Sequence, residues 1–318
     1  MTKVIDHIRN ANKTFFSFEI LPPSAGESIE VLFKNISPLM EFKPKFIDVT
    51  YHREEFIYKK RAGGLLEQKS IRKRPGTVAI CTALMHKFNV DTVPHIICGG
   101  FTKEETEYAL IDLNYLGIDN VLALRGDSVK GQMDFIVTSG GHSYASELVE
   151  QISRLNQGFY LNDEIENAHP TNFCIGVAGY PEKHFEAANR ESDLKWLKHK
   201  VSMGAEYVVT QMFFDNKKYF DFVRFCRNVG ITVPIIPGIK PLLSKKQLSL
   251  LPSRFYIDIP TELSVEVEKC KTNEEVKKIG IEWAINQCQE LIKENVPCLH
   301  FYSMGKSTAI TEIATKLF

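Results

Sequence analysis

The stretch of this sequence best suited to chemistry is Leu124-Arg125-Gly126-Asp127, where an apolar run ends in a cation, a glycine and a carboxylate. Residues 121–124 are apolar throughout, as expected of a buried parallel strand with both faces covered. Parallel α/β proteins bind ligands at the carboxyl ends of such strands. The stretch therefore predicts a ligand site, with a structural Arg–Asp pair closing a barrel mouth as the alternative.

A second candidate is Glu19, a carboxylate inside the otherwise apolar run of residues 15–20. Burial favours the neutral form of a glutamate, which can then hold a proton near neutral pH and donate it. Leu21-Pro22-Pro23 must end the strand directly afterwards. Glu19 is therefore a candidate general acid, and a paired structural carboxylate is the alternative.

Polar residues also follow most of the other apolar runs. They include Thr50, Tyr51, His95, Tyr180, His184, Gln211 and Lys306. Any one of them is more often a satisfied hydrogen-bonding group than a functional one. Their joint appearance after so many strands favours one shared site.

The elements that must position these residues alternate along the chain. Strands are predicted at residues 15–20, 46–50, 93–98, 121–124, 173–178, 207–211, 235–238 and 298–302. Helices are predicted at residues 29–40, 76–88, 143–155, 193–203, 218–228 and 307–317, and capping boxes at Thr102/Glu105 and Thr272/Glu275 open two more. Pro38 predicts a kink or break in the first helix. Eight strands separated by helices predict one α/β domain over residues 1–318, a (β/α)8 TIM barrel.

Composition narrows the class of protein. The 318 residues are 44% hydrophobic and 25% charged, and Lys plus Arg balance Asp plus Glu at 39 each, which favours no nucleic-acid partner. The seven cysteines include no Cys-x-x-Cys pair, and we predict that they are reduced thiols. No run approaches the roughly 18 apolar residues of a membrane span, and the first residues lack a leader pattern, so we expect a cytoplasmic protein without membrane contact.

Several sharper motifs are missing from the sequence. No Gly-x-Gly-x-x-Gly follows a predicted strand, which argues against a Rossmann nucleotide site. No His-Glu-x-x-His or compact cysteine-histidine cluster occurs, so no metal site is predicted. No nucleophile elbow points to a Ser-His-Asp hydrolase.

An ordered set of motifs nevertheless resembles one family, the methylenetetrahydrofolate reductases. The set comprises Ser17-Phe18-Glu19 with Pro22-Pro23, Asp48-Val49-Thr50-Tyr51, Pro94-His95, Leu124-Arg125-Gly126-Asp127, Tyr144-Ala145, Tyr180-Pro181-Glu182, Thr210-Gln211-Met212-Phe213-Phe214-Asp215, Ile236-Pro237-Gly238-Ile239 and His300-Phe301-Tyr302. Each motif alone is weak, but together they span nearly the whole chain. The chain is similar to the short bacterial form, a catalytic barrel without the regulatory domain of the animal enzymes.

The resemblance implies a (β/α)8 barrel that binds FAD noncovalently and uses NADH or NADPH as co-substrate. The implied reaction is a ping-pong reduction of 5,10-methylenetetrahydrofolate to 5-methyltetrahydrofolate, which supplies methyl groups for methionine synthesis. Glu19 matches the general acid that opens the bridged substrate to the 5-iminium cation. Asp127 matches a carboxylate beside flavin and folate whose charge favours that cation. Hydride transfer belongs to the flavin, and the protein supplies orientation, electrostatics and a proton.

Other residues match binding positions of the family. The flavin-contacting positions are Thr50, Tyr51, His95, Leu124, Arg125, Gly126, Asp127, Tyr144, Ala145, Tyr180, His184, Ala187, Asp193 and Lys200. The folate-contacting positions are Glu19, Asp127, Gln211, Gln247 and Lys306, and Gln211 is also expected near the nicotinamide. Lys306 stands where many relatives have an arginine for the folate glutamate tail.

Two other functions are compatible with the same barrel. One is another flavin barrel, such as a relative of proline dehydrogenase. The other is a scaffolding or partner-dependent subunit that has lost the reaction, since a fold does not fix a function. The sequence carries no interface signature, and a homo-oligomer is an expectation drawn from barrel flavoproteins of this kind.

Overall fold

The computed structural model describes residues 1–128, 134–303, 305 and 307–318. Its main sheet is built of β1 (Phe15–Ile20), β2 (Phe46–Val49), β5 (Asp91–Ile97), β6 (Asn120–Leu124), β7 (Cys174–Gly179), β8 (Tyr207–Thr210), β9 (Ile235–Ile236), β10 (Gly238–Ile239) and β11 (Cys298–Tyr302). All the pairings in this sheet are parallel. The predicted strands are therefore confirmed, with boundary shifts of one or two residues.

The order of the strands closes the sheet into a barrel. The order runs β10-β11-β1-β2-β5-β6-β7-β8-β9, and its two ends are halves of one chain segment separated only by Pro237. Proline has no N–H to donate to a strand ladder, which explains the interruption. The Pro237 carbonyl still accepts a hydrogen bond of 3.1 Å from the His300 N–H. The predicted TIM-like α/β barrel, folded as a single domain, is thereby confirmed.

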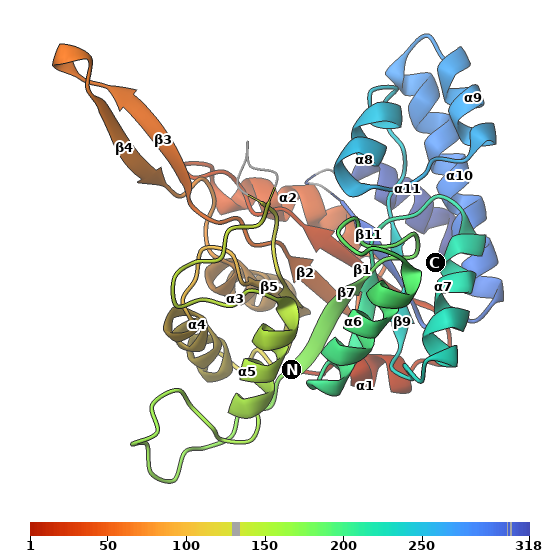
Figure 1. The fold of residues 1–318 in the computed structure, drawn as a ribbon. Helices are drawn as coiled ribbons and strands as arrows, with labels where there is room; N and C mark the ends of the chain where they lie inside the picture. The colour runs from red at the N-terminus through yellow and green to blue at the C-terminus, as the bar shows by residue number, and fades with distance from the viewer. Residues whose placement is uncertain (129–133, 304, 306) are drawn as a thin grey trace.

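Helices alternate with the strands and cover the outside of the barrel (Figure 1). They are α2 (Ile29–Met40), α3 (Thr77–Phe88), α4 (Lys103–Tyr115), α5 (Ala145–Leu155), α6 (Arg190–Ser202), α7 (Asn216–Asn228), α8 (Gln247–Phe255), α9 (Thr261–Lys269), α10 (Asn273–Lys293) and α11 (Thr308–Leu317). The predicted capping boxes are present at Thr102 and Thr272. The predicted break at Pro38 is wrong, because α2 continues through the proline to Met40; the missing proline N–H removes only one hydrogen bond of the helix.

The barrel interior is closed at the amino ends of the strands. The short helix α1 (Val4–Arg9) lies there, and its Val4 N–H donates a 2.8 Å hydrogen bond to Asn120 Oδ1 at the start of β6. Val4 and Ile5 pack on inward-facing residues of the strands, namely Phe15, Phe46, Val93, Leu122, Cys174, Tyr207, Val209, Ile236 and Cys298. Each large apolar side chain buried in this layer stabilises the fold by roughly 1.5–3 kcal/mol. We call this set the floor layer.

One element stands apart from the barrel. The hairpin of β3 (Glu55–Lys60) and β4 (Leu66–Ile71), joined through the 3-10 turn Ala62–Gly64, projects far from the body of the molecule (Figure 1). The sequence predicted no element here. Most of the hairpin residues are exposed, so no buried face imposes an alternation of apolar and polar residues on the sequence.

Candidate active site

The carboxyl end of the barrel interior contains a cluster of ionisable side chains. Because strand residues two positions apart share a face, Glu19 points to the same side of β1 as the floor residue Phe15. In the parallel register Glu19 stands opposite Asp48 of β2 and Tyr302 of β11. The alternation that builds the apolar floor therefore brings polar side chains together one layer higher.

His95 of β5 lies between the two carboxyl groups. Its Nε2 is 3.6 Å from Glu19 Oε2 and 3.4 Å from Asp48 Oδ2. The exposed fractions of the three side chains are 14% for Glu19, 1% for Asp48 and 6% for His95. Among the described residues, neither oxygen of Asp48 nor His95 Nε2 has a hydrogen-bond partner. Buried polar atoms without hydrogen-bond partners are costly for a fold and are typical of functional sites.

Burial controls the protonation of both carboxyl groups. It raises the pKa of Glu19 from its ordinary value of 4.5 to about 7; His95 opposes the shift, the charge of Asp48 adds to it, and Lys240 opposes it. Burial likewise raises the pKa of Asp48 to about 6, against the influence of His300. Glu19 can therefore hold a proton at neutral pH, as a general acid must.

The basic groups around this pair are shifted in the opposite direction. Burial lowers the pKa of His95 and of His300 below the ordinary 6.5, so both imidazoles are neutral at pH 7. His300 Nδ1 lies 2.9 Å from Ser17 Oγ. Burial also lowers the pKa of Lys240 to about 8, partly offset by Glu19. The pocket thus contains one compact group of ionisable side chains whose pKa values depend on one another.

The turn after β6 lies at the rim of this mouth. Arg125 Nη2 is 2.6 Å from Glu186 Oε2, and the Arg125 guanidinium lies 5.0 Å from the ring centre of Phe135. The structure therefore pairs Arg125 with Glu186 rather than with Asp127, which is exposed. Gly126 has a φ of +87°, a conformation that a residue with a Cβ adopts only with strain.

The predicted flavin residues after β7 form a second rim group with α6. The rings of Tyr180 and His184 meet edge to face at 4.7 Å, and the His184 N–H donates to Asp193 Oδ2 at 3.1 Å. The Ala187 N–H donates to the His184 carbonyl. Lys200 Nζ donates to the Ala178 carbonyl at 2.6 Å, and burial lowers its pKa to about 8 while Asp193 opposes the shift.

The remaining predicted flavin residues lie on other elements around the mouth. Thr50 follows β2 and donates its hydroxyl to the Ile20 carbonyl at 3.2 Å. The Tyr51 ring packs edge to face on Phe101 at 4.9 Å. Leu124 ends β6. Tyr144 and Ala145 stand at the start of α5, where Tyr144 is 54% exposed and its ring stacks 6.2 Å from Trp196.

The predicted folate residues are held by short-range contacts. Gln211 follows β8, and its Oε1 accepts from the Met212 N–H at 2.9 Å. Gln247 begins α8, and its Oε1 accepts from the N–H groups of Leu243 and Ser244 at 2.6 and 3.1 Å. Lys306 lies outside the described residues.

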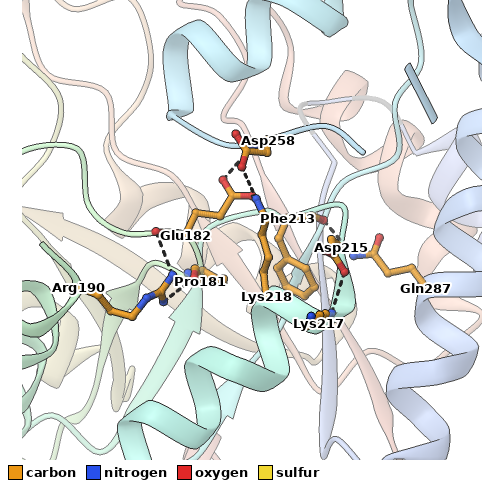
Figure 2. Close-up of polar contacts among 9 residues, drawn as sticks. All are labelled: Pro181, Glu182, Arg190, Phe213, Asp215, Lys217, Lys218, Asp258 and Gln287. Atoms are coloured by element: carbon orange, nitrogen blue, oxygen red, sulfur yellow. Dashed lines mark hydrogen bonds and ion pairs between the residues drawn. The ribbon is translucent and has the colours of Figure 1, made fainter. Parts of the chain in front are cut away.

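The segment that carries Gln211 is anchored from α10. Figure 2 shows the Gln287 side chain bonded to the Phe213 carbonyl, at 2.9 Å, and Asp215 capping α7 through the Lys217 N–H, also at 2.9 Å. Trp283 Nε1 of α10 adds a 2.9 Å bond to the Phe214 carbonyl. Three consecutive loop residues are thereby tied to neighbouring helices.

A network of salt bridges and hydrogen bonds joins this loop region to the turn after β7. Lys218 Nζ of α7 contacts Glu182 Oε1 at 2.8 Å and also the carboxylate of Asp258, which follows α8 (Figure 2). The Asp258 N–H in turn donates to Glu182 Oε2 at 2.8 Å. Arg190 donates to the carbonyls of Pro181 and Glu182 at 2.9 and 3.3 Å. These contacts fix the shape of the rim.

A cavity of about 520 Å³ opens beside the mouth, between α3, α4 and the outer face of β5. Its lining is mostly apolar and includes Tyr51 and His95. Glu19 and the β6 turn lie outside that lining, so the cavity adjoins the ionisable cluster without containing it.

The sequence analysis gave no site role to three members of the cluster. Asp48 and His300 appeared there only within family motifs, and Lys240 was missed altogether. Asp48 gave the same signal as Glu19, a carboxylate within an apolar strand, and could have been found from it. Lys240 directly follows the Ile235–Ile239 strand segment. Their convergence depends on the closure of the barrel, which short sequence windows do not contain.

Three basic side chains at the rim suit the phosphate groups of an anionic dinucleotide such as FAD. Arg125 and Lys200 lie on it, and Arg53 Nη2 is buried without a hydrogen-bond partner among the described residues. Arg53 packs on Gly99, where a Cβ would come within 3.3 Å of its Nη1. Guanidinium and ammonium groups of this kind bind phosphate oxygens. The residues present therefore fit the group.

Fold and site together define an α/β-barrel protein with a buried, proton-holding cluster at the carboxyl ends of its strands. The model of the family "Methylenetetrahydrofolate reductase" matches residues 3–318, and the chain belongs to that family. The described residues include no helix long and apolar enough to cross a membrane.

Relatives in plants and bacteria give the same result. The chain is 34% identical over 316 residues to "Methylenetetrahydrofolate reductase (NADH) 1" of Arabidopsis thaliana, covering 95% of this chain but 48% of the relative. It is 30% identical over 292 residues to "5,10-methylenetetrahydrofolate reductase" of Salmonella typhimurium, covering 92% of this chain and 86% of the relative. The chain thus spans about half the length of the plant relatives it matches.

A solved structure supports the fold alone. It is a Clostridium thermocellum protein described as binding two copies of 5-methyl-5,6,7,8-tetrahydrofolic acid. It aligns with a TM-score of 0.56 and 15% sequence identity over 96% of each chain.

Proposed function

We propose that this chain reduces 5,10-methylenetetrahydrofolate to 5-methyltetrahydrofolate, using FAD and a reduced nicotinamide. The observation that carries the proposal is the buried carboxyl of Glu19 at the mouth of the barrel. Its pKa of about 7 lets it hold a proton, and the chain belongs to the family that the proposed reaction defines. Opening the methylene bridge of the substrate requires such a donor. The whole of residues 1–318 would then serve as one catalytic domain.

The residues divide the work by their position. Glu19 donates its carboxyl proton to the bridged substrate, which opens to the 5-iminium cation. The exposed carboxylate of Asp127 stabilises that cation by its charge. Gln211, Gln247 and Lys306 orient the folate. After donation Glu19 is reprotonated from solvent at the mouth, so each turnover consumes one proton.

Cofactor binding is assigned to the rim. Arg125, Lys200 and Arg53 supply the cations, while Tyr180, His184 and Tyr144 supply rings near the predicted flavin positions. When bound there, FAD would supply the hydride chemistry between the nicotinamide and the folate. The assay uses both NADH and NADPH as the reductant.

Anaerobic absorbance spectroscopy of the purified protein tests the proposal. Flavin bands should bleach with NADH or NADPH and return when methylenetetrahydrofolate is added. A protein that takes up no FAD would instead favour the scaffolding subunit. Flavin that ignores nicotinamide but bleaches with proline would favour the other flavin barrel.

A further inference from the structure

Asp48 is a second buried carboxyl beside the acid proposed above. It stands in direct register with Glu19 on the neighbouring strand, with 1% of its side chain exposed. Neither of its oxygens has a hydrogen-bond partner among the described residues. The proposed steps of proton donation, folate binding and flavin binding do not use it. A carboxyl group left unsatisfied in a dry core calls for an explanation.

His95 connects the two carboxyl groups geometrically. A single atom, Nε2, faces both, at 3.6 Å from Glu19 Oε2 and 3.4 Å from Asp48 Oδ2. A neutral imidazole nitrogen either donates or accepts one hydrogen bond, so it can serve only one of these carboxyls at a time. In the structure Nε2 makes a hydrogen bond to neither carboxyl, but both lie within 4 Å of it, so a change in the protonation of either carboxyl acts on the same imidazole.

Other titratable groups complete the surroundings of the pair. Facing Glu19 are His95 of β5, Lys240 after β10 and Tyr302 of β11, and facing Asp48 are His300 and Cys298 of β11, Tyr207 of β8 and Cys81 of α3. The pKa of each tyrosine and thiol is raised, and both histidines are neutral at pH 7. The ionised lysine favours loss of the proton from Glu19, and Asp48 opposes it.

We propose that Asp48 is a positioning residue that keeps Glu19 protonated between turnovers, with His95 as the link, so that the two carboxyls behave as one coupled pair. The inference rests on the proposed function, in which Glu19 is the acid. Two carboxylates in one dry site do not ionise independently, so a charge on Asp48 makes loss of the Glu19 proton harder. Asp48 itself gives no proton to the substrate.

The test uses single turnovers of the holoenzyme. Flavin reduced anaerobically is reoxidised by methylenetetrahydrofolate from about pH 5 to about pH 9, and the rate should fall as Glu19 loses its proton. In Asp48→Asn the midpoint of this fall should move to lower pH by about one unit, a roughly tenfold slower reaction above the midpoint. The reduction of the flavin by NADH should not change.

Two further variants test the direction of the shift in the midpoint and provide a control. Lys240→Met removes the opposing charge and should move the midpoint to higher pH. Asp91→Asn removes a carboxylate at the amino end of β5, where it pairs with His7 at 2.6 Å, and should leave the midpoint in place. If Asp48→Asn fails to fold, Asp48→Ser replaces it with the same expectation. A midpoint unmoved in a folded Asp48 variant would overturn the proposal, even if the rate fell uniformly.

An infrared titration separates this proposal from the function on which it rests. If the wild-type flavin is never reoxidised by the folate, the proposed function fails. The band of the protonated Glu19 carboxyl still reports the coupling in that case, because it needs no turnover. It should disappear at lower pH in Asp48→Asn than in the wild type, and an identical titration in both would overturn the coupling.

Discussion

Two layers of the same barrel interior differ in chemistry although they share the same strands. At the amino ends, Phe15 and Phe46 belong to the apolar floor layer. Four residues after Phe15 on β1 lies Glu19, and two residues after Phe46 on β2 lies Asp48; both belong to the ionisable cluster. Strand geometry is the same in both layers, since residues two apart share a face. The difference in function therefore lies in side-chain type alone.

The comparison teaches how the fold tolerates a costly site. Burying unpaired carboxyls destabilises a protein, because each loses its hydration without a full set of partners. The floor layer offsets this with large apolar side chains packed at the amino ends of the strands, including Phe46, which is fully buried. Changes in the cluster should therefore alter chemistry at little cost or even a gain in stability. Changes in the floor should do the reverse.

Glu19→Gln should produce the largest effect. The amide keeps the size of the side chain but carries no proton to give, so reoxidation of the reduced flavin by methylenetetrahydrofolate should slow by about 100-fold or more. Reduction by NADH should continue, as stopped-flow absorbance can follow in both half-reactions. The control is Glu107→Gln, a buried glutamate on α4 outside the barrel interior. Normal folate turnover in Glu19→Gln would remove Glu19 from the mechanism.

Phe46→Ala tests the opposite layer. Loss of a fully buried ring under the cluster should lower the free energy of unfolding by about 3–5 kcal/mol, measured by urea denaturation. Tyr115→Ala, at a ring that is 86% exposed, should change it by less than about 0.5 kcal/mol. If both variants were equally stable, packing in the floor layer would not offset the cost of the ionisable cluster.

The double variant Glu19→Gln with Asp48→Asn should change the stability in the opposite direction to Phe46→Ala. Because both folded-state pKa values are raised, to about 7 and about 6, the contribution of this pair to the stability of the wild type is greatest below about pH 4 and is lost as pH rises through about 6 and 7. The amides do not titrate and should escape this loss. At about pH 8 the variant should be more stable by about 6 kcal/mol, and near pH 4 the difference should vanish. Equal stability at both pH values would contradict the raised pKa values.

The sequence predicted the strands of the barrel better than the hairpin of β3 and β4 and the helices α8 and α9. Most barrel strands are largely apolar runs buried on both faces, a signal contained within a few residues, as in 121–124. The hairpin of β3 and β4 has no such run, because its cross-strand pairs project away from the core. Helices α8 and α9 were also missed; α8 is short and contains Pro252, which favours reading the region as a loop.

The candidate site was predicted only in part. Glu19 stands out because a charge interrupts an apolar strand, and the rim residues follow from resemblance to the family. The position of His95 between two carboxyls depends on the lateral register of β1, β2 and β5, which are far apart in sequence. The same holds for the pairing of Arg125 with Glu186, 61 residues further along the chain. Such contacts follow from closure of the barrel rather than from any local pattern.

The most direct test of the account is the protonation of Glu19 itself. Infrared difference spectra of the wild type and Glu19→Gln across neutral pH isolate the protonated-carboxyl band of this one residue. The account predicts a band that is present in the wild type, absent in the variant, and lost with a midpoint near the pKa of about 7. A Glu19 that titrates near its ordinary value of 4.5 would be ionised at neutral pH, and the proton-holding cluster would not exist.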